Sequence, residues 1–280
     1  MEIETYRPLL FSLAYHLLGS VTEAEDVVQD VWVDWLKKDR REIAQPKSYL
    51  CRMTANKSRD RLKRLMQERT QYIGPWLPEP QVQPMWEPLN QEMLSLGLLR
   101  LLEQLNPLER VVFVLREVFE WGYEEVASIL DQQAAACRQQ MRRARQKLAL
   151  PEKRYAPTPS QVAALQDAFQ AAVSEQKLEP FMDLLQEEVA LYSDGGGKVA
   201  AALKPLHGKA KVEKFLRGIW GVAPASLSYM PVWANGELGV LIQQAGTFYS
   251  LMCFELSQTG IREVLIVRNP DKATGLVGFG

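Results

Sequence analysis

Acidic side chains in the first helical segment could bind a basic partner. Asp26, Asp30 and Asp34 recur every four residues, so they share one face of a predicted helix. Gln29 lies beside them. Like charges at this spacing repel one another by roughly a few tenths of a kcal/mol per pair. The stripe therefore suits a basic protein surface, and a solvated face whose carboxylates happen to align is the alternative.

A basic segment between Arg52 and Arg69 could bind nucleic acid. It carries seven cations against two acids, and Tyr49 and Asn56 lie close by in the sequence. Cations on a helix neutralise phosphates, and an aromatic side chain stacks on an unpaired base. A solubilising helix face is the alternative interpretation. The cations are Arg52, Lys57, Arg59, Arg61, Lys63, Arg64 and Arg69.

A third cluster has the order of a helix–turn–helix. A short helix is predicted over 123–130 and a longer one over about 133–148, and the second lacks acids. Arg138 and Arg142 share one face of it, as expected for a helix placed against a DNA major groove. Gln139 could read a base edge, because an amide pairs bidentately with adenine. The alternative is a basic amphipathic helix on the surface of a bundle.

Helices must hold all three clusters, and capping residues mark their boundaries. Gly19 suits a helix C-terminus because glycine adopts positive φ freely. Ser20 and Thr22 each have a glutamate three residues later, the spacing of a capping box, so the next helix begins at one of the two. Asn106, followed by a proline and then by Glu109, marks the start of a later helix.

Prolines divide the chain in two places. Five prolines stand between residues 75 and 88, and three stand between 151 and 159. Proline at that density forbids a helix and favours an extended linker. The expected domains are 1–70, 93–150 and 160–280, joined by linkers over 71–92 and 151–159.

The last domain changes from helix to strand. A helix predicted over 160–175 is followed by five apolar runs typical of strands. Asn235-Gly236 and Ala245-Gly246 mark hairpin turns, whose central residues need positive φ. Helices followed by a strand meander predict an α+β domain. The strands are expected at 189–192, 227–234, 238–243, 247–256 and 263–267, with a helix at 208–220.

Composition excludes several classes of protein. The net charge is −1 at pH 7, so nucleic-acid binding must depend on local clusters of charge. The three cysteines form no disulfide framework, and neither histidine has a partner at metal-ligand spacing, so no metal or cofactor is expected. Neither an apolar stretch of about 18 residues nor a signal segment is present. We therefore expect a cytoplasmic protein without a membrane partner.

Together, the acidic stripe, the basic segment and the helix–turn–helix resemble bacterial sigma factors of the extracytoplasmic-function (ECF) group. Residues 25–31 are similar to that family's polymerase-clamp helix. Residues 46–50 and 56–60 are similar to its minus-ten-reading segment. The motifs similar to its minus-thirty-five-reading domain are at 108–110, 123–127 and 142–145.

The rest of the chain narrows the resemblance to the SigJ-like subgroup. Those factors carry a C-terminal SnoaL-like domain in place of a separate anti-sigma protein, and the motifs at 74–80, 194–198 and 269–272 resemble them. The implied fold is multidomain: two all-α sigma domains, a helical bundle and a helix–turn–helix, followed by an α+β SnoaL-like cone domain. Asp131 stands where the family commonly has glycine, and Ala273 where the subgroup usually has leucine.

The resemblance implies partners and roles. RNA polymerase core would be bound through its β′ coiled coil and its β flap, and promoter DNA through the minus-ten and minus-thirty-five elements. The residues implied for the β′ coiled coil are Asp26, Gln29 and Asp30. Those implied for the minus-ten element are Tyr49, Asn56, Lys57, Arg59 and Arg61. Those implied for the minus-thirty-five element are Arg138, Gln139, Arg142 and Arg143.

A SnoaL-like cone could house an enzyme, which would need a carboxylate or a histidine poised in an apolar pocket. Asp194 precedes three glycines and suits a tight loop, whereas His207 suits a surface position beside a helix start. Glu255 could face either side of its strand. We therefore expect no enzyme activity, and no residue pattern identifies a small ligand for the cone.

We expect the third domain to regulate the first two. Gly195-Gly196-Gly197 permits positive φ and a close approach of backbone to another surface, and Lys198 adds a charge. The hypothesis is that this loop and the tail at 269–272 dock on the first module or on the linker and set the spacing of the DNA-binding modules. The residues of this interface would be Trp76, Asp194, Gly195, Gly196, Gly197, Lys198, Asn269, Pro270, Asp271 and Lys272.

Two other functions fit parts of the pattern. One is an isomerase-like enzyme fused to a helical adaptor, and the other is a helix–turn–helix repressor that works without polymerase. The transcription hypothesis requires charge to be sorted by helix, with the cations presented to phosphate rather than held in internal ion pairs.

Overall fold

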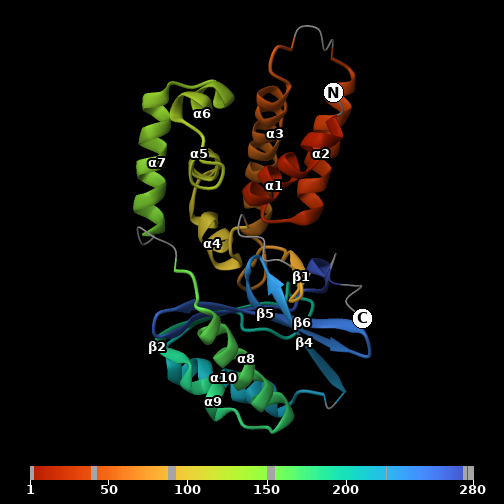
Figure 1. Ribbon diagram of the computed structural model, residues 1–280, viewed down its shortest axis with the longest axis vertical. Coiled ribbons are helices and arrows are strands. Elements are labelled where there is room, and N and C mark those ends of the chain that lie inside the picture. The colour runs from red at the N-terminus through yellow and green to blue at the C-terminus, as the bar shows by residue number, and fades with distance from the viewer. Residues whose placement is uncertain are drawn as a thin grey trace. The chain divides into compact units, whose positions relative to one another are not determined.

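The chain folds into two compact units in a computed structural model (Figure 1). One unit joins Met1–Gln71 to Leu98–Leu150, and the other joins Tyr72–Gly97 to Pro151–Gly280. Parts of both predicted linkers, 88–92 and 151–154, lie outside the described residues. The structure describes residues 3–38, 43–87, 93–149, 155–224, 226–273 and 276.

The first helices carry the acidic stripe and the basic segment. They are η1 (Ile3–Tyr6), α1 (Arg7–Leu18), α2 (Val21–Leu36) and α3 (Pro46–Arg69). Gly19 ends α1 with a φ of 67°, as predicted. The side chain of Ser20 accepts a hydrogen bond from the backbone N–H of Glu23, so α2 begins at the first of the two predicted starts. Leu13 of α1 and Val31 of α2 are fully buried.

The second set of helices contains the predicted helix–turn–helix. Its elements are α4 (Leu96–Leu101), η3 (Leu102–Gln104), α5 (Pro107–Glu117), α6 (Tyr123–Leu130) and α7 (Ala134–Leu148). Asn106 is the N-cap of α5, as predicted, and it forms a capping box with Glu109. Asp131 ends α6 with a φ of 54°, a left-handed conformation that aspartate tolerates better than most residues. The tight turn is therefore kept without glycine.

The two sets of helices pack against each other inside the first unit. Helix α1 contacts α5, and α3 contacts both α5 and α6. The ring of His16 on α1 lies edge-on to Phe119, with 6.1 Å between the centroids. The segments with sigma-like motifs thus form one packed body in this structure.

A seven-stranded mixed sheet forms the centre of the second unit. The strands run in the order β1-β4-β5-β6-β7-β2-β3, and β2 pairs with β7 in parallel while the other pairs are antiparallel. The sheet is therefore more than the expected meander. The strands are β1 (Val82–Pro84), β2 (Leu185–Asp194), β3 (Leu206–His207), β4 (Leu227–Ala234), β5 (Glu237–Gln244), β6 (Thr247–Ser257) and β7 (Gly260–Val267).

Helices cover one face of this sheet. The group of α8 (Pro159–Ser174), α9 (Glu179–Asp183) and α10 (Lys209–Gly221) lies together there (Figure 1). Aromatic side chains lie among the aliphatic ones that pack in the core of this unit. Phe169 makes edge or tilted contacts with Phe181, Trp220 and Phe254, with centroid distances of 5.6–6.2 Å. The predicted α+β class is confirmed, and these aromatic side chains form part of the core.

The proline-rich linker covers the other face. Val240 and Leu241 are adjacent in β5 and belong to different core clusters, as expected from the alternation of side chains in a strand. Leu77 of the linker and Leu96, which follows the linker at the start of α4, are buried in the cluster that contains Leu241. The linker is therefore part of the core of the second unit.

Strand β1 also comes from the predicted linker. It pairs with β4, from Val82 opposite Ala234 to Pro84 opposite Val232. Proline at the edge of a sheet costs no ladder hydrogen bond when its nitrogen faces outward. The extended backbone is confirmed here, but the pairing with a strand 152 residues further along the chain (Val82 to Ala234) was not predicted. No helix in the described part of the chain is long and apolar enough to span a bilayer.

Candidate functional sites

The acidic stripe on α2 is exposed but partly engaged. Asp26, Gln29 and Asp30 all lie at the surface. A carboxylate oxygen of Asp26 accepts a hydrogen bond of 3.1 Å from Arg61 of α3. Asp34 forms an ion pair of 2.8 Å with Lys57, whose hydrogen bond and charge lower the pKa of the Asp34 carboxyl.

The cations of α3 are less free than expected. Arg61 pairs with both Glu23 and Asp26, and its hydrogen bond to Glu23 raises the pKa of the guanidinium. Lys57 is held by Asp34. The prediction that α3 presents its cations without internal ion pairs is therefore wrong for six of the seven. Lys57 and Arg61 pair with carboxylates of α2, which packs beside α3. The other four pair with acids of α3 itself or with Glu103: Arg59, Lys63, Arg64 and Arg69.

Tyr49 lies at the edge of an open cavity of about 470 Å³. Its ring is 6.0 Å from that of Trp35, and Arg52 lines the same cavity. Ser128 and Ile129 of α6 line it from the helix–turn–helix side. The candidate base-stacking residue and the helix–turn–helix therefore border one space in this arrangement.

Helix α7 presents its candidate DNA-reading residues outward. Cys137, Met141, Ala144 and Leu148 form its buried side. The opposite side carries four exposed residues implied for the minus-thirty-five element, Arg138, Gln139, Arg142 and Arg143.

Two of the α7 arginines have no ion-pair partner among the described residues. Arg138 forms an ion pair of 2.9 Å with Glu124 and lies 5.3 Å from the ring centre of Tyr123. Across the residues that the structure describes, Arg142 and Arg143 form no ion pair. These two guanidinium groups are available to phosphates or bases.

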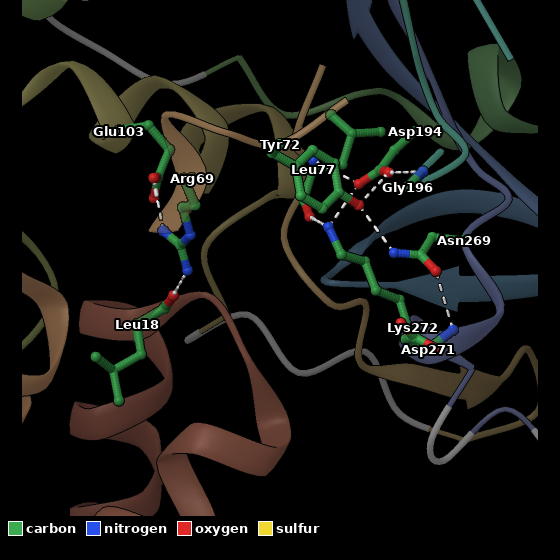
Figure 2. A network of polar contacts seen from close by, with 10 residues as sticks. All are labelled: Leu18, Arg69, Tyr72, Leu77, Glu103, Asp194, Gly196, Asn269, Asp271 and Lys272. Carbon is green, nitrogen blue, oxygen red and sulfur yellow. Dashed lines mark hydrogen bonds and ion pairs between the residues drawn. The ribbon is translucent and has the colours of Figure 1, made fainter. Parts of the chain in front are cut away.

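A buried polar cluster, missed in the sequence, joins the two helix sets. Glu103 accepts hydrogen bonds from Arg69 of α3, at 2.6 Å, and from the fully buried Arg110 of α5. Arg69 also donates to the backbone oxygen of Leu18, at 2.9 Å (Figure 2). Burial would raise the pKa of Glu103, but the two guanidinium groups lower it below its usual value, so the carboxyl stays ionised.

His16 lies beside this cluster and is kept neutral. Burial, with a smaller contribution from the charge of Arg110, lowers the pKa of its imidazole to about 4. Its Nδ1 is 3.4 Å from the hydroxyl of Ser12. A charged imidazole here would face the buried cation of Arg110.

Asp194 binds the start of the linker. One oxygen of its buried carboxylate accepts a hydrogen bond of 2.6 Å from the hydroxyl of Tyr72 and one of 3.0 Å from the backbone N–H of Gly196. The other oxygen accepts the backbone N–H of Leu77 at 2.8 Å and the ammonium of Lys272 at 2.5 Å (Figure 2). We call these contacts, together with Asn269, the linker latch.

The tail completes the latch. Lys272 also donates to the backbone oxygen of Leu77, and its ammonium lies 4.3 Å from the ring centre of Trp76. The side-chain amide of Asn269 donates to the Tyr72 hydroxyl at 2.8 Å (Figure 2). Burial and the neighbouring carboxylate of Asp194 raise the pKa of Tyr72, so its hydroxyl keeps the proton that it donates.

The glycine loop approaches the tail closely. Gly196 has a φ of 59°, and a Cβ atom there would lie 2.4 Å from Nδ2 of Asn269. A Cβ at Gly195 would lie 2.4 Å from the backbone oxygen of Val199. Gly197 also has positive φ, at 71°.

The remaining residues of the predicted interface lie at its surface. Lys198 forms an exposed ion pair of 2.6 Å with Asp271, and Pro270 begins the short helix η4 (Pro270–Lys272). The structure thus brings together all three motifs that the subgroup resemblance singled out.

The three candidate catalytic residues each have a structural setting instead. Each carboxylate oxygen of Asp194 already accepts two hydrogen bonds within the latch. Glu255 forms an ion pair of 2.8 Å with Arg262. His207 is exposed, with its ring 6.3 Å from that of Tyr192. Among the described residues there is no group of carboxylates, histidines and cysteines that could hold a metal ion.

Known proteins match this chain over both halves. The family described as Sigma-70 region 2 matches residues 3–68, and Sigma-70, region 4 matches residues 95–148. The ECF RNA polymerase sigma factor SigJ of Mycobacterium tuberculosis is 31% identical over 98% of this chain and 93% of its own length. The probable ECF RNA polymerase sigma factor SigI of the same species is 33% identical over 66% of each chain.

Solved structures agree with the sequence comparison. The crystal structure of M. tuberculosis SigJ matches with a TM-score of 0.76 and 27% identity, over 98% of this chain and 99% of that chain. Since the similarity extends through the C-terminal domain, it covers the linker and the latch motifs as well as the helical modules. The chain therefore belongs to the ECF RNA polymerase sigma factors, proteins that bind RNA polymerase core and promoter DNA to direct transcription initiation and are not enzymes.

Proposed function

We propose that the C-terminal domain regulates this sigma factor by holding the linker between its two promoter-binding modules. The observation that carries the proposal is the linker latch, in which a buried carboxylate of the C-terminal domain binds the start of the linker. The single segment that joins region 2 to region 4, Tyr72–Gly97, belongs to the same compact unit as the C-terminal domain.

The physical effect of such a hold is a loss of linker freedom. An unrestrained chain of this length would have an end-to-end distance of roughly 30 Å, with wide variation. Burial of Leu77 and Leu96 in the core of the C-terminal unit and pairing of β1 with β4 remove that variation. The C-terminal domain would then set the distance between the two ends of the linker.

Promoter contacts are proposed on exposed residues of α7 and on half-buried residues of α3. Arg142 and Arg143, with Arg138 and Gln139, would bind the minus-thirty-five element, because they form the outer side of α7. Asn56 and Tyr49 would bind the minus-ten element, and Lys57, Arg59 and Arg61 would have to leave their carboxylate partners to join them.

Polymerase would meet the outer side of α2 and the helix–turn–helix module. Asp26, Gln29 and Asp30 would contact the β′ coiled coil, and region 4 would contact the β flap. Of the three, Asp26 is also paired with Arg61, so Asp30 is the cleaner probe of the interface. We propose that the protein acts in the cytoplasm, where RNA polymerase binds promoter DNA.

The packed arrangement of the first unit would have to open before promoter binding. Ser128 and Ile129 border the cavity at Tyr49, so a DNA strand entering there would compete with α6 for space. A latch that fixes the linker therefore favours the resting arrangement over the active one.

Run-off transcription with core polymerase tests the regulatory proposal. Tyr72→Phe removes the hydroxyl that joins Asp194 to Asn269 and keeps the ring. We expect several-fold more transcript than from the native chain at equal polymerase occupancy. Lys198→Met, which breaks only an exposed pair, is the control and should leave output unchanged. Equal output from Tyr72→Phe and the native chain would overturn the proposal.

A pull-down of core polymerase tests the proposed interface. Asp30→Arg should weaken capture strongly, because it places a cation against a basic surface. Asp60→Arg on α3, another exposed acid, is the matched charge reversal and should leave capture unchanged. Equal capture by both variants would contradict the assignment of α2.

A further inference from the structure

We infer that Asn235 is a second anchor of the linker, which positions the start of region 4 independently of the latch. This inference rests on the proposed function and deepens it. The linker latch holds the linker at Tyr72 and Leu77, at its beginning. Asn235 binds the backbone of Gln81 and of Leu94, the two residues that flank the segment 82–93.

One residue makes all the contacts of this second anchor. The side-chain oxygen of Asn235 accepts the backbone N–H of Gln81 at 2.9 Å, and its amide nitrogen donates to the backbone oxygen of Leu94 at 3.0 Å. The backbone N–H of Asn235 also donates to the backbone oxygen of Gln81 at 2.9 Å. The side chain is almost fully buried, so water does not replace these bonds when they break.

Asparagine fits this position for two reasons. The residue occupies the first central position of the β4–β5 turn with a φ of 51°, a conformation that asparagine adopts readily. It also carries one acceptor and one donor on the same short side chain, so it can bind a backbone N–H and a backbone C=O together. The hairpin alone requires only the first property.

The anchor bears directly on where region 4 begins. Leu94 lies two residues before α4, and Leu96 of α4 is buried in the core of the second unit. A Cβ at Gly97 would lie 3.0 Å from a carboxylate oxygen of Glu255, so the backbone is close to that side chain as well. Holding Leu94 therefore fixes the position at which the chain leaves the C-terminal domain for the helix–turn–helix module.

The two anchors are separate in structure. Among the described residues, the side-chain hydrogen bonds of Asn235 to Gln81 and Leu94 involve none of the residues that form the linker latch. Asn235 comes from the turn after β4, whereas the latch comes from the end of β2 and from the tail. Each should therefore be released without loosening the other.

Amide hydrogen exchange on the full chain tests this. Asn235→Gly keeps the backbone conformation and removes both side-chain bonds, whereas Asn235→Asp keeps the acceptor for Gln81 and loses the donor for Leu94. Ala245→Gly is the matched control, because Ala245 occupies the same place in the β5–β6 turn with a φ of 50°. Asp194→Asn reports on the latch.

We expect Asn235→Gly to speed exchange by about three- to tenfold at Gln81 and over 93–97, with no change over 72–77. Asn235→Asp should keep Gln81 protected and speed exchange over 93–97 only. Asp194→Asn should show the reverse, with faster exchange over 72–77 alone. A variant that only weakened the β4–β5 hairpin would speed exchange over 72–77 and over 93–97 alike. Its exchange pattern would then resemble that of Ala245→Gly, which alters a hairpin turn without touching the linker.

The inference is overturned if Asn235→Gly leaves 93–97 as protected as in the native chain, or if it loosens 72–77 equally. Run-off transcription with the same variants then tests the proposed function on its own. Unchanged output from both Asn235→Gly and Asp194→Asn would contradict regulation by the linker, while the exchange pattern would still establish Asn235 as an anchor.

Discussion

The ammonium of Lys272 lies 2.5 Å from a carboxylate oxygen of Asp194, and both side chains are almost fully buried. A buried charge is costly unless it is paired and hydrogen-bonded, and this carboxylate has four donors around it. Two of the four come from the linker, at Tyr72 and Leu77. Release of the linker would therefore leave the carboxylate poorly satisfied, which is why the latch should stay closed in the resting protein.

Lys272→Met should destabilise the C-terminal unit by about 3–5 kcal/mol, because it leaves the Asp194 carboxylate buried without its cation. The free energy of unfolding in urea measures this. Lys198→Met, which breaks an exposed ion pair with Asp271, should cost less than about 1 kcal/mol. Similar losses in the two variants would show that the buried pair contributes no more than a surface pair.

Gly196→Ala should break the contact between the glycine loop and the tail. The new Cβ would lie 2.4 Å from Nδ2 of Asn269, at a φ of 59° that alanine rarely adopts, and we expect a loss of about 2–4 kcal/mol. Gly246→Ala is the control, because it has a φ of 75° but no atom within 4 Å of the new Cβ. It should lose only the conformational part, about 1 kcal/mol. Thermal unfolding of both variants gives the comparison.

Local patterns predicted most helices and strands. Gly19, Ser20 and Asn106 mark helix ends by their own backbone and side-chain chemistry, so neighbouring residues were enough to place them. The same holds for the Asn235-Gly236 turn. The second role of Asn235 was not visible, because its partners Gln81 and Leu94 are more than 140 residues away in the chain.

Long-range contacts account for the other differences. Arg61 lies in a segment whose composition is typical of DNA binding. The carboxylates of Glu23 and Asp26 nevertheless pair with it, because α2 packs on α3. Prolines predicted an extended linker and could not show that Val82–Pro84 would pair with β4. Arg69 and Glu103 belong to segments that looked like separate modules, so their ion pair depends on tertiary packing alone.

Arg142→Ala and Arg143→Ala should each weaken binding of the polymerase holoenzyme to promoter fragments that contain the minus-thirty-five element. Each lost phosphate contact should reduce the slope of log K against log salt by about 1. Lys177→Ala, an exposed cation in the C-terminal unit, should leave the slope unchanged. An unaltered slope in both α7 variants would remove these residues from the DNA interface.

Acid should open the packed arrangement of regions 2 and 4 through His16. Its pKa is lowered to about 4 in the packed state and should return towards 6.5 when the imidazole meets water. The neutral form favours packing, so the stabilisation is complete above about pH 6.5 and falls as the pH approaches 4. Between pH 7 and pH 5 the ratio of open to packed forms should rise by about 20-fold.

The charges that face His16 support this sign. Arg110, which is fully buried, adds repulsion when the imidazole is protonated, and the carboxylate of Glu103 is already shared by Arg110 and Arg69. Glu103 stays ionised through this range because the two guanidinium groups lower its pKa. The protonation of His16 is therefore the step that unbalances the cluster.

Spin labels at Val33 on α2 and Gln146 on α7, both exposed, would measure the separation at pH 7 and pH 5. The native chain should shift toward longer distances in acid, and His16→Gln should show no such shift because it cannot be protonated. His207→Gln changes the other histidine, which is exposed in the C-terminal unit, and should keep the full response. If His16→Gln still shifted toward longer distances in acid, a group other than the imidazole of His16 would control the opening.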